Sequence, residues 1–250
     1  MMTSEQLPAF PVAKAPGRVS RALIRLMMKH ARIVASETLG ERYRLVTLEG
    51  ADLEGAEWVA GEFVQVAMGS AFRARAYTPI DWDADAGRMR LLGFVHGGGP
   101  GSAWIDSMRP GDECDFFGPR RSLDVRHLSG PLAFFGDETA IGLAYALIYQ
   151  NPSRRVICHF EVDDTAAARA AVQRLGIAAV CTVHARQPGE GHLGDIEDGL
   201  VNGGGEGAHF VLSGKAGTVQ QLRQALRQRG IPSARLLAKA YWAPGKAGLD

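Results

Sequence analysis

The residues best suited to ligand chemistry lie in the segment Arg75-Ala76-Tyr77-Thr78-Pro79. Arg75 carries a fixed charge and forked donors that suit a phosphate. Tyr77 follows two residues later, so in a strand it points to the same side as Arg75, and Thr78 adds a hydroxyl. A flat aromatic ligand with a phosphate tail would satisfy all three, although an ordinary edge strand could also end in Thr-Pro.

A glycine-rich segment follows about 25 residues later: His96-Gly97-Gly98-Gly99-Pro100-Gly101-Ser102-Ala103-Trp104. A loop of this kind that enters a helix offers free backbone N–H groups and the positive end of the helix dipole, which suit a pyrophosphate. The alternative is a flexible turn with Ser102 as a simple N-cap. The two segments together in one domain indicate a ligand site more specifically than either segment does alone.

Acidic residues follow two apolar segments in the second half of the chain. Gly136-Asp137-Glu138-Thr139-Ala140 comes after the apolar Pro131–Phe135 and opens a predicted helix, where the dipole suits a nucleotide phosphate. First-turn acids are also favoured by the dipole alone. Asp163 and Asp164 end the next predicted strand, where an acidic group can hold a ribose hydroxyl and would disfavour a 2′-phosphate.

Two different patterns of apolar and polar residues predict the elements that position these residues. Alternating short segments predict six strands of a closed or nearly closed antiparallel barrel: 30–37, 42–49, 63–67, 73–77, 89–95 and 113–117. Apolar strands then alternate with helices and predict a parallel sheet: strands 131–135, 155–160, 177–183, 209–212 and 235–238, with helices 139–149, 166–175 and 219–229. The run Gly203–Gly207 is predicted to be a surface loop.

These patterns predict three parts: residues 1–29 as an N-terminal arm with a short helix at 18–28, residues 30–127 as the barrel domain, and residues 128–250 as the α/β domain. The chain has 250 residues, 28 Lys+Arg, 27 Asp+Glu and a net charge of +1, so a dedicated nucleic-acid binder is not expected. No apolar run is long enough to span a membrane.

Metal sites are not expected either. The three cysteines are far apart, and without a CxxC spacing they do not predict a zinc site or an iron–sulfur cluster. The seven histidines are scattered, and no pair is spaced i, i+4 on a predicted helix, so no metal ligands are assigned. The cysteine usage fits a reducing cytosol, and a cytoplasmic location is expected.

The motifs together resemble the ferredoxin reductase superfamily and, within it, the siderophore-interacting proteins, a family of FAD-dependent ferric-siderophore reductases. Arg75-x-Tyr77-Thr78 resembles the flavin-binding signature, and His96-x-x-Gly99-Pro100-Gly101-Ser102-x-Trp104 is similar to the pyrophosphate loop. Gly136-Asp137-Glu138-Thr139 resembles the turn of the nicotinamide domain, and Tyr241-Trp242 resembles the C-terminal signature. The chain departs from the family at Ala240, Ala243 and Ser213-Gly214-Lys215, which bears on the siderophore more than on the flavin.

The resemblance implies roles for individual residues. Arg75 would neutralise an FAD phosphate, Tyr77 would stack on the isoalloxazine and Thr78 would hydrogen-bond near its N5. The other implied cofactor contacts are His96, Gly101, Ser102, Trp104, Gly136, Asp137, Glu138, Thr139, Tyr241 and Trp242. Arg235, Lys239 and Lys246 form a basic set that could receive an anionic iron chelate, or an ordinary solvated surface.

The resemblance implies an N-terminal flavin-binding barrel and a C-terminal Rossmann-like nucleotide-binding domain. Electrons would pass from NADH or NADPH through FAD to a ferric siderophore or other iron chelate, and Fe(II) would be released. No catalytic acid or base is assigned, because the cofactor carries this chemistry. A ferredoxin donor remains open, as do a general NAD(P)H–flavin reductase, an electron-transfer component, and a non-enzymatic flavin- or iron-chelate-binding protein.

Overall fold

The structure, a computed structural model, describes residues 28–70 and 73–246. The first half forms an antiparallel sheet of seven strands in the order β4-β3-β7-β1-β2-β6-β5. The strands are β1 Lys29–Thr38, β2 Tyr43–Glu49, β3 Phe63–Ser70, β4 Arg73–Tyr77, β5 Pro79–Asp83, β6 Arg88–Phe94 and β7 Glu113–Arg120. The two edge strands, β4 and β5, are separated in the chain only by Thr78. Because one residue spans about 3.5 Å, the sheet curls until its edges meet at Thr78.

Helix α2 (Gly99–Ser107) follows β6 and packs against the barrel. Ile105 is buried in the barrel core among side chains such as Ile33, Val64 and Phe116. A Cβ on Gly93 of β6 would lie 2.4 Å from Ile105, so only glycine lets the helix come this close. This packing fixes the start of α2 over β4.

The second half is a parallel sheet of five strands in the order β10-β9-β8-β11-β12, flanked by helices. Its strands are β8 Leu132–Asp137, β9 Val156–Val162, β10 Cys181–Ala185, β11 His209–Lys215 and β12 Leu236–Trp242. Its helices are α3 Ile141–Gln150, α4 Thr165–Arg174, α5 His192–Gly204 and α6 Ala216–Gln228, and a 3-10 turn, Glu138–Ala140, precedes α3.

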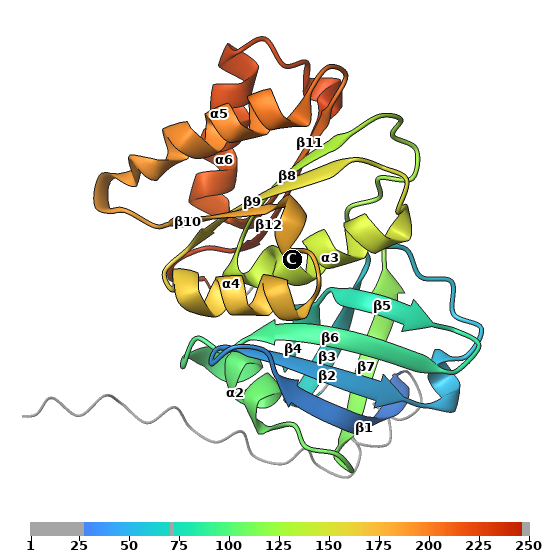
Figure 1. Cartoon of the computed structure of the whole chain (residues 1–250). Coiled ribbons are helices and arrows are strands. Elements are labelled where there is room, and N and C mark those ends of the chain that lie inside the picture. The colour runs from blue at the N-terminus through green and yellow to red at the C-terminus, as the bar shows by residue number, and fades with distance from the viewer. Residues whose placement is uncertain (1–27, 71–72, 247–250) are drawn as a thin grey trace, which may run out of the picture.

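One of the apolar clusters contains residues of both halves. α3 and α4 lie between the parallel sheet and the barrel, whereas α5 and α6 cover the other face of the sheet (Figure 1). A Cβ on Gly142 of α3 would lie 2.9 Å from Ile80 of the barrel, so this glycine permits close approach between the two halves. We call this contact region between the barrel and the parallel-sheet half the seam. At the edge of the seam Arg90 of β6 donates to the Tyr145 hydroxyl of α3 at 3.1 Å.

The predicted fold class, an antiparallel barrel followed by a parallel sheet with helices, is confirmed. The predicted boundary at residues 127 and 128 falls in the connection between β7 and β8, and the division into domains stays a prediction. The predicted helix 18–28 and most of the arm lie outside the described residues. Within the described ranges, no helix is long and apolar enough to cross a membrane.

Two elements were not predicted. The strand β5 begins with Pro79 and contains two aspartates, and a proline is tolerated there because β5 is an edge strand. The helix α5 contains four glycines, which disfavour helices. A Cβ on Gly199 would lie 2.2 Å from His159, and one on Gly203 would lie 2.6 Å from Ile157, so close packing on the sheet requires them.

Three predicted boundaries were also wrong. The run Gly203–Gly207 is not wholly a loop, because Gly203 and Gly204 end α5. The strand β10 begins at Cys181 rather than at residue 177, after a 3-10 turn. The last strand runs from Leu236 to Trp242 and so includes both residues of the C-terminal signature.

Candidate functional site

Arg75 and Tyr77 lie on the edge strand β4, beside the start of α2. The Tyr77 hydroxyl donates to the Gly101 carbonyl at 2.7 Å, and its ring packs against Trp104 with centroids 5.1 Å apart. Burial raises the pKa of Tyr77, so its hydroxyl stays a donor. The Arg75 guanidinium donates to the Ala74 carbonyl at 2.8 Å and has no carboxylate partner in the described part of the chain. Its other donors can therefore take an anion.

The loop before α2 presents backbone donors next to this strand. Gly97 has open space around its α-carbon, and Gly98 and Gly99 have only the His96 ring nearby. The N-cap, Gly98, has no side-chain cap, so the first N–H groups of α2 are not satisfied by a side chain. Gly101 meets β4 closely: its Cβ would lie 3.2 Å from the Tyr77 hydroxyl. The structure thus brings the two predicted segments together.

Ser102 shapes this loop rather than facing outward. Its side chain is buried, and its hydroxyl accepts from the backbone N–H groups of His96 at 3.0 Å and Gly97 at 3.3 Å. His96 stacks on Phe94, over whose ring the Arg42 guanidinium lies at 5.4 Å. Partial burial, followed by the charge of Arg42, lowers the pKa of His96, which favours a neutral imidazole.

Thr78 connects the barrel to the C-terminal strand. Its Oγ1 lies 2.9 Å from the hydroxyl of Tyr241, 163 residues later in the chain. Tyr241 occupies a β-bulge: Gly214 pairs with Ala240 and Lys215 pairs with Trp242, which leaves Tyr241 without a register partner. Such bulges redirect side chains, and here the redirected hydroxyl reaches the point where the two edges of the barrel meet.

Asp137 ends β8 and is fully buried. Its Oδ1 accepts from the backbone N–H of Thr139 at 2.9 Å and from its hydroxyl at 2.6 Å, while its Oδ2 accepts from the Trp242 indole at 2.7 Å. Gly214, at φ +110°, gives it room, since a Cβ there would lie 2.5 Å from the carboxyl carbon. Burial raises the pKa of Asp137 to about 6, and the neighbouring charge of Glu138 adds to the rise.

The carboxylate of Glu138 is also bonded within the protein, to partners that the sequence did not reveal. Its Oε1 accepts from the backbone N–H of Asp163 at 2.6 Å, and its Oε2 lies 3.0 Å from Nη2 of Arg186. Nη1 of Arg186 lies 2.6 Å from the Asp163 carboxylate, and Nη2 lies 3.9 Å from Glu161. Asp164 caps α4 through the N–H of Ala167 at 2.9 Å. The acids at this sheet edge therefore have structural partners.

Two further buried side chains were missed, Tyr43 on the barrel side of the parallel sheet and His192 at the start of α5. The buried hydroxyl of Tyr43, from β2, has no hydrogen-bond partner among the described residues. Burial, followed by the charges of Glu138 and Asp137, raises its pKa, so it stays protonated. His192 is buried with its Nε2 2.9 Å from Glu161, while its Nδ1 accepts from the N–H of Gln187 at 3.2 Å. No sequence motif marks either residue, because both belong to contacts between distant segments.

The predicted basic set is distributed along β12, and its role stays a prediction. Arg235 lies before β12, Lys239 lies within it and Lys246 follows its end. A strand rises about 3.3 Å per residue, so Arg235 lies about 20 Å from Tyr241. Lys215 is closer to the seam, as the register partner of Trp242, with its ammonium 4.0 Å from Glu190.

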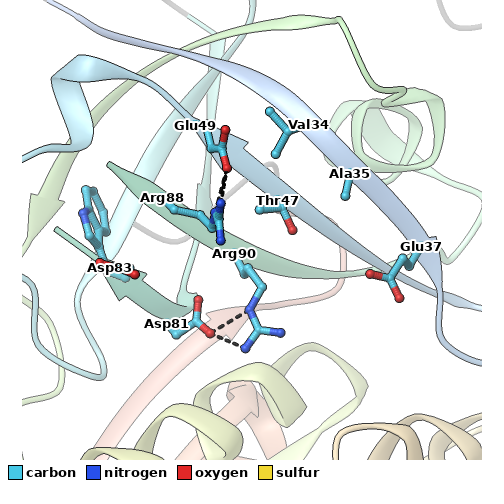
Figure 2. A pocket seen from close by; sticks show the side chains of 10 residues that line it. Val34, Ala35, Glu37, Thr47, Glu49, Asp81, Asp83, Arg88 and Arg90 are labelled. Carbon is cyan, nitrogen blue, oxygen red and sulfur yellow. Dashed lines mark hydrogen bonds and ion pairs between the residues drawn. The ribbon is translucent and has the colours of Figure 1, made fainter. Parts of the chain in front are cut away.

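A hollow on the outer face of the barrel is separate from these residues (Figure 2). It is lined by Val34, Ala35, Glu37, Thr47, Glu49, Asp81, Trp82, Asp83, Arg88 and Arg90. Both arginines are paired with acids there, Arg88 with Glu49 at 2.6 Å and Arg90 with Asp81. None of the predicted ligand-binding residues lines it. Within the described residues, no group of three or more His, Cys, Asp or Glu side chains could hold a metal ion.

Comparisons with known proteins agree with this arrangement. Residues 17–123 match the siderophore-interacting FAD-binding domain, and residues 131–245 match the siderophore-interacting protein domain. No curated protein sequence matches the chain.

Solved structures resemble the chain over most of its length. A siderophore utilization protein from T. fusca is 23% identical with a TM-score of 0.70, covering 89% of this chain and 95% of its own. The siderophore-interacting protein SipS from Aeromonas hydrophila is 19% identical with a TM-score of 0.69, covering 88% and 93%. Phthalate dioxygenase reductase is 16% identical with a TM-score of 0.68, covering 88% and 70%. At these identities the likeness shows the fold.

Proposed function

The chain belongs to the siderophore-interacting protein family, and we propose that it is an FAD-dependent oxidoreductase that passes electrons from NAD(P)H to a ferric siderophore. The family match supports a flavin-dependent electron-transfer role. The observation that carries the finer proposal is the corner where β4 meets α2, which fits a flavin nucleotide. This fit depends on this chain's own side chains and not on the likeness of folds.

The corner offers three features that FAD requires. Arg75 has donors free of any described carboxylate, the glycines at 97–99 leave their backbone accessible, and the first turn of α2 has no side-chain cap. These groups would hold the pyrophosphate. Tyr77, fixed by the Gly101 carbonyl, would present its ring to the isoalloxazine, and Thr78 would face the flavin at the barrel edge.

A nicotinamide nucleotide would bind at the carboxyl edge of the parallel sheet. The strand order reverses between β8 and β11, which in open α/β sheets marks the usual ligand crevice. The side chains of Asp137 and Glu138 are already bonded within the protein, so backbone groups of this turn, with Lys215, would make the contacts. The exposed Asp163 would meet a ribose hydroxyl and disfavour a 2′-phosphate, which makes NADH the proposed donor.

Bound FAD supplies the conversion of one hydride into two single-electron transfers, which balances two Fe(III) reduced per NADH oxidised. Hard oxygen ligands hold Fe(III) better than Fe(II), so reduction loosens the chelate. The protein needs only to orient the partners and to keep its cations near the anionic chelate. Lys239 and Lys246 are the candidates on the β12 side, and Arg235, before the strand begins, is the member of the set farthest along the chain from Tyr241.

An anaerobic titration tests the proposal. FAD-loaded protein is mixed with NADH or NADPH, and loss of the visible flavin bands is followed; a ferric siderophore is then added. We expect NADH to bleach the flavin faster than NADPH, and the chelate to restore the bands with release of Fe(II). A flavin that neither nucleotide bleaches would contradict the nicotinamide step. Iron reduction no faster than free-flavin reduction would instead favour a general flavin reductase.

A further inference from the structure

Asp137 is placed to act on other side chains rather than on a ligand. Its carboxylate is 0% exposed, and both of its oxygens accept hydrogen bonds from Thr139 or Trp242. A ligand could reach it only by displacing one of these partners. Burying an ionised carboxylate costs free energy unless it is hydrogen-bonded. The Asp137–Trp242 contact therefore indicates a structural role within the protein.

Trp242 is joined to the barrel through the residue before it. The indole N–H donates to Asp137 at 2.7 Å, which fixes one end of the bulge in β12. Tyr241 lies in that bulge, and its hydroxyl lies 2.9 Å from Oγ1 of Thr78. The hydroxyl of Ser213, on the neighbouring β11, donates to the Lys239 carbonyl at 3.0 Å and fixes the other side of the bulge. A continuous chain of contacts thus runs from β8 to the barrel edge.

We propose that Asp137 is a positioning residue for Thr78 across the seam: it holds the Trp242 indole, and the bulge held in this way presents the Tyr241 hydroxyl to Thr78. The flavin consequence rests on the proposed function, which places Thr78 beside the flavin.

The charged and titratable neighbours of Asp137 are few. Glu138 adjoins it on the same turn and is compensated by Arg186. Tyr43 from β2 and Tyr241 from β12 both carry raised pKa values and stay neutral. Lys215 follows Gly214 on β11, but its ammonium lies toward Glu190 at 4.0 Å. Glu161, the register partner of Asp137 on β9, lies 2.9 Å from His192 and 3.9 Å from Arg186. Because Glu161 and His192 are also titratable, a titration of the Trp242 indole reports Asp137 only if it is lost in Asp137→Asn.

The first test follows the indole N–H signals of the protein without FAD by ¹H–¹⁵N NMR over pH. The Trp242 signal is assigned with Trp242→Phe. We expect it to titrate in the wild type and in Asp198→Asn, which removes an exposed carboxylate of α5 paired with Arg229, and not in Asp137→Asn. Trp82, whose indole donates to the Leu53 carbonyl at 3.0 Å, should not titrate. A Trp242 signal that is independent of pH, or that titrates in Asp137→Asn, overturns the contact.

The second test measures the reduction potential of bound FAD. We expect Tyr241→Phe, Trp242→Phe and Asp137→Asn to shift it in the same direction, and the double variant Asp137→Asn/Tyr241→Phe to shift it no further than Tyr241→Phe alone. Additive shifts, or no shift in Trp242→Phe, overturn the positioning role even if Asp137→Asn fails to fold. A wild type that takes up no FAD overturns the proposed function and the flavin part of this inference, while the indole signals still decide the contact.

Discussion

The β4–α2 corner and the carboxyl edge of β8 both carry a glycine-containing motif at the start of a helical segment, but their polar groups are used differently. At the corner, the Arg75 donors other than the one bonded to Ala74, and the backbone N–H groups of Gly98 and Gly99, have no partner among the described residues and can meet a ligand. At the edge, Asp137 and Glu138 are buried and bonded to the protein. A charged motif near a helix start therefore does not by itself identify a binding group. Whether its side chains can bind a ligand depends on whether they are already bonded within the protein.

The largest effect is expected when the positive charge of Arg186 is removed from the sheet edge. In Arg186→Ala the buried carboxylates of Glu138 and Glu161 lose their compensating charge, and we expect the free energy of unfolding to fall by about 3–5 kcal/mol. Urea unfolding measures this loss. Arg229→Ala, which removes exposed pairs with Glu197 and Asp198, is the matched control and should change stability far less. Equal losses in both variants would show that the edge is not a stabilising network.

A methyl group at the same edge should have the next largest effect. In Gly214→Ala the new Cβ would lie 2.5 Å from the Asp137 carboxyl carbon, at a φ of +110° that other residues rarely adopt. We expect a loss of about 2–4 kcal/mol of stability from strain and overpacking. Thermal unfolding tests it, with Gly194→Ala in α5, where the added Cβ has open space, as control. A Gly214→Ala variant as stable as that control would contradict the close packing.

The pH dependence of stability should separate the two regions further. Burial raises the pKa of Asp137 to about 6, above that of an aspartate in the unfolded chain, so ionisation destabilises the folded state. As pH rises from about 4 to about 7, the wild type should lose on the order of 2–3 kcal/mol relative to Asp137→Asn. Urea unfolding of both proteins across this range measures the difference. A difference that does not change with pH would place the pKa near its ordinary value.

The smallest of these effects is expected from an added methyl group at the β4–α2 corner. A Cβ in Gly101→Ala would lie 3.2 Å from the Tyr77 hydroxyl and 3.4 Å from Arg75 Cγ, which requires a shift of a few tenths of an ångström. We expect FAD affinity to fall roughly three- to tenfold, about 1 kcal/mol, with stability nearly unchanged. A fluorescence titration with FAD measures the affinity, and Gly194→Ala again serves as control. A large loss of stability with intact FAD binding would reverse the roles given to the two regions.

The sequence predicted the fold class and the two segments that meet at the β4–α2 corner because both depend on local patterns; the binding of flavin there stays a prediction. Arg75 and Tyr77 share one strand, and the glycines at 97–101 precede one helix, so spacing was enough to place them. The helix α5 was missed because its glycines serve packing against His159 and Ile157, a tertiary requirement that overrides helix propensity.

The sheet edge could be predicted only in part. The turn at residues 136–139 was found, but the partners of its acids come from three other segments. Arg186 follows β10, Trp242 ends β12 and Asp163 follows β9, and no local pattern links them to Asp137 or Glu138. Arg235, Lys239 and Lys246 lie before, within and after β12, and their predicted role as a basic set stays a prediction.

The most direct measurement is FAD binding to Arg75→Ala beside the wild type and Arg88→Ala, a barrel arginine already paired with Glu49. Because a charge-assisted hydrogen bond contributes about 1.5–3 kcal/mol, Arg75→Ala should bind FAD about 10- to 100-fold more weakly with unchanged unfolding, while Arg88→Ala should bind like the wild type. Equal FAD affinity in all three proteins would contradict the assignment of the β4–α2 corner as the flavin site.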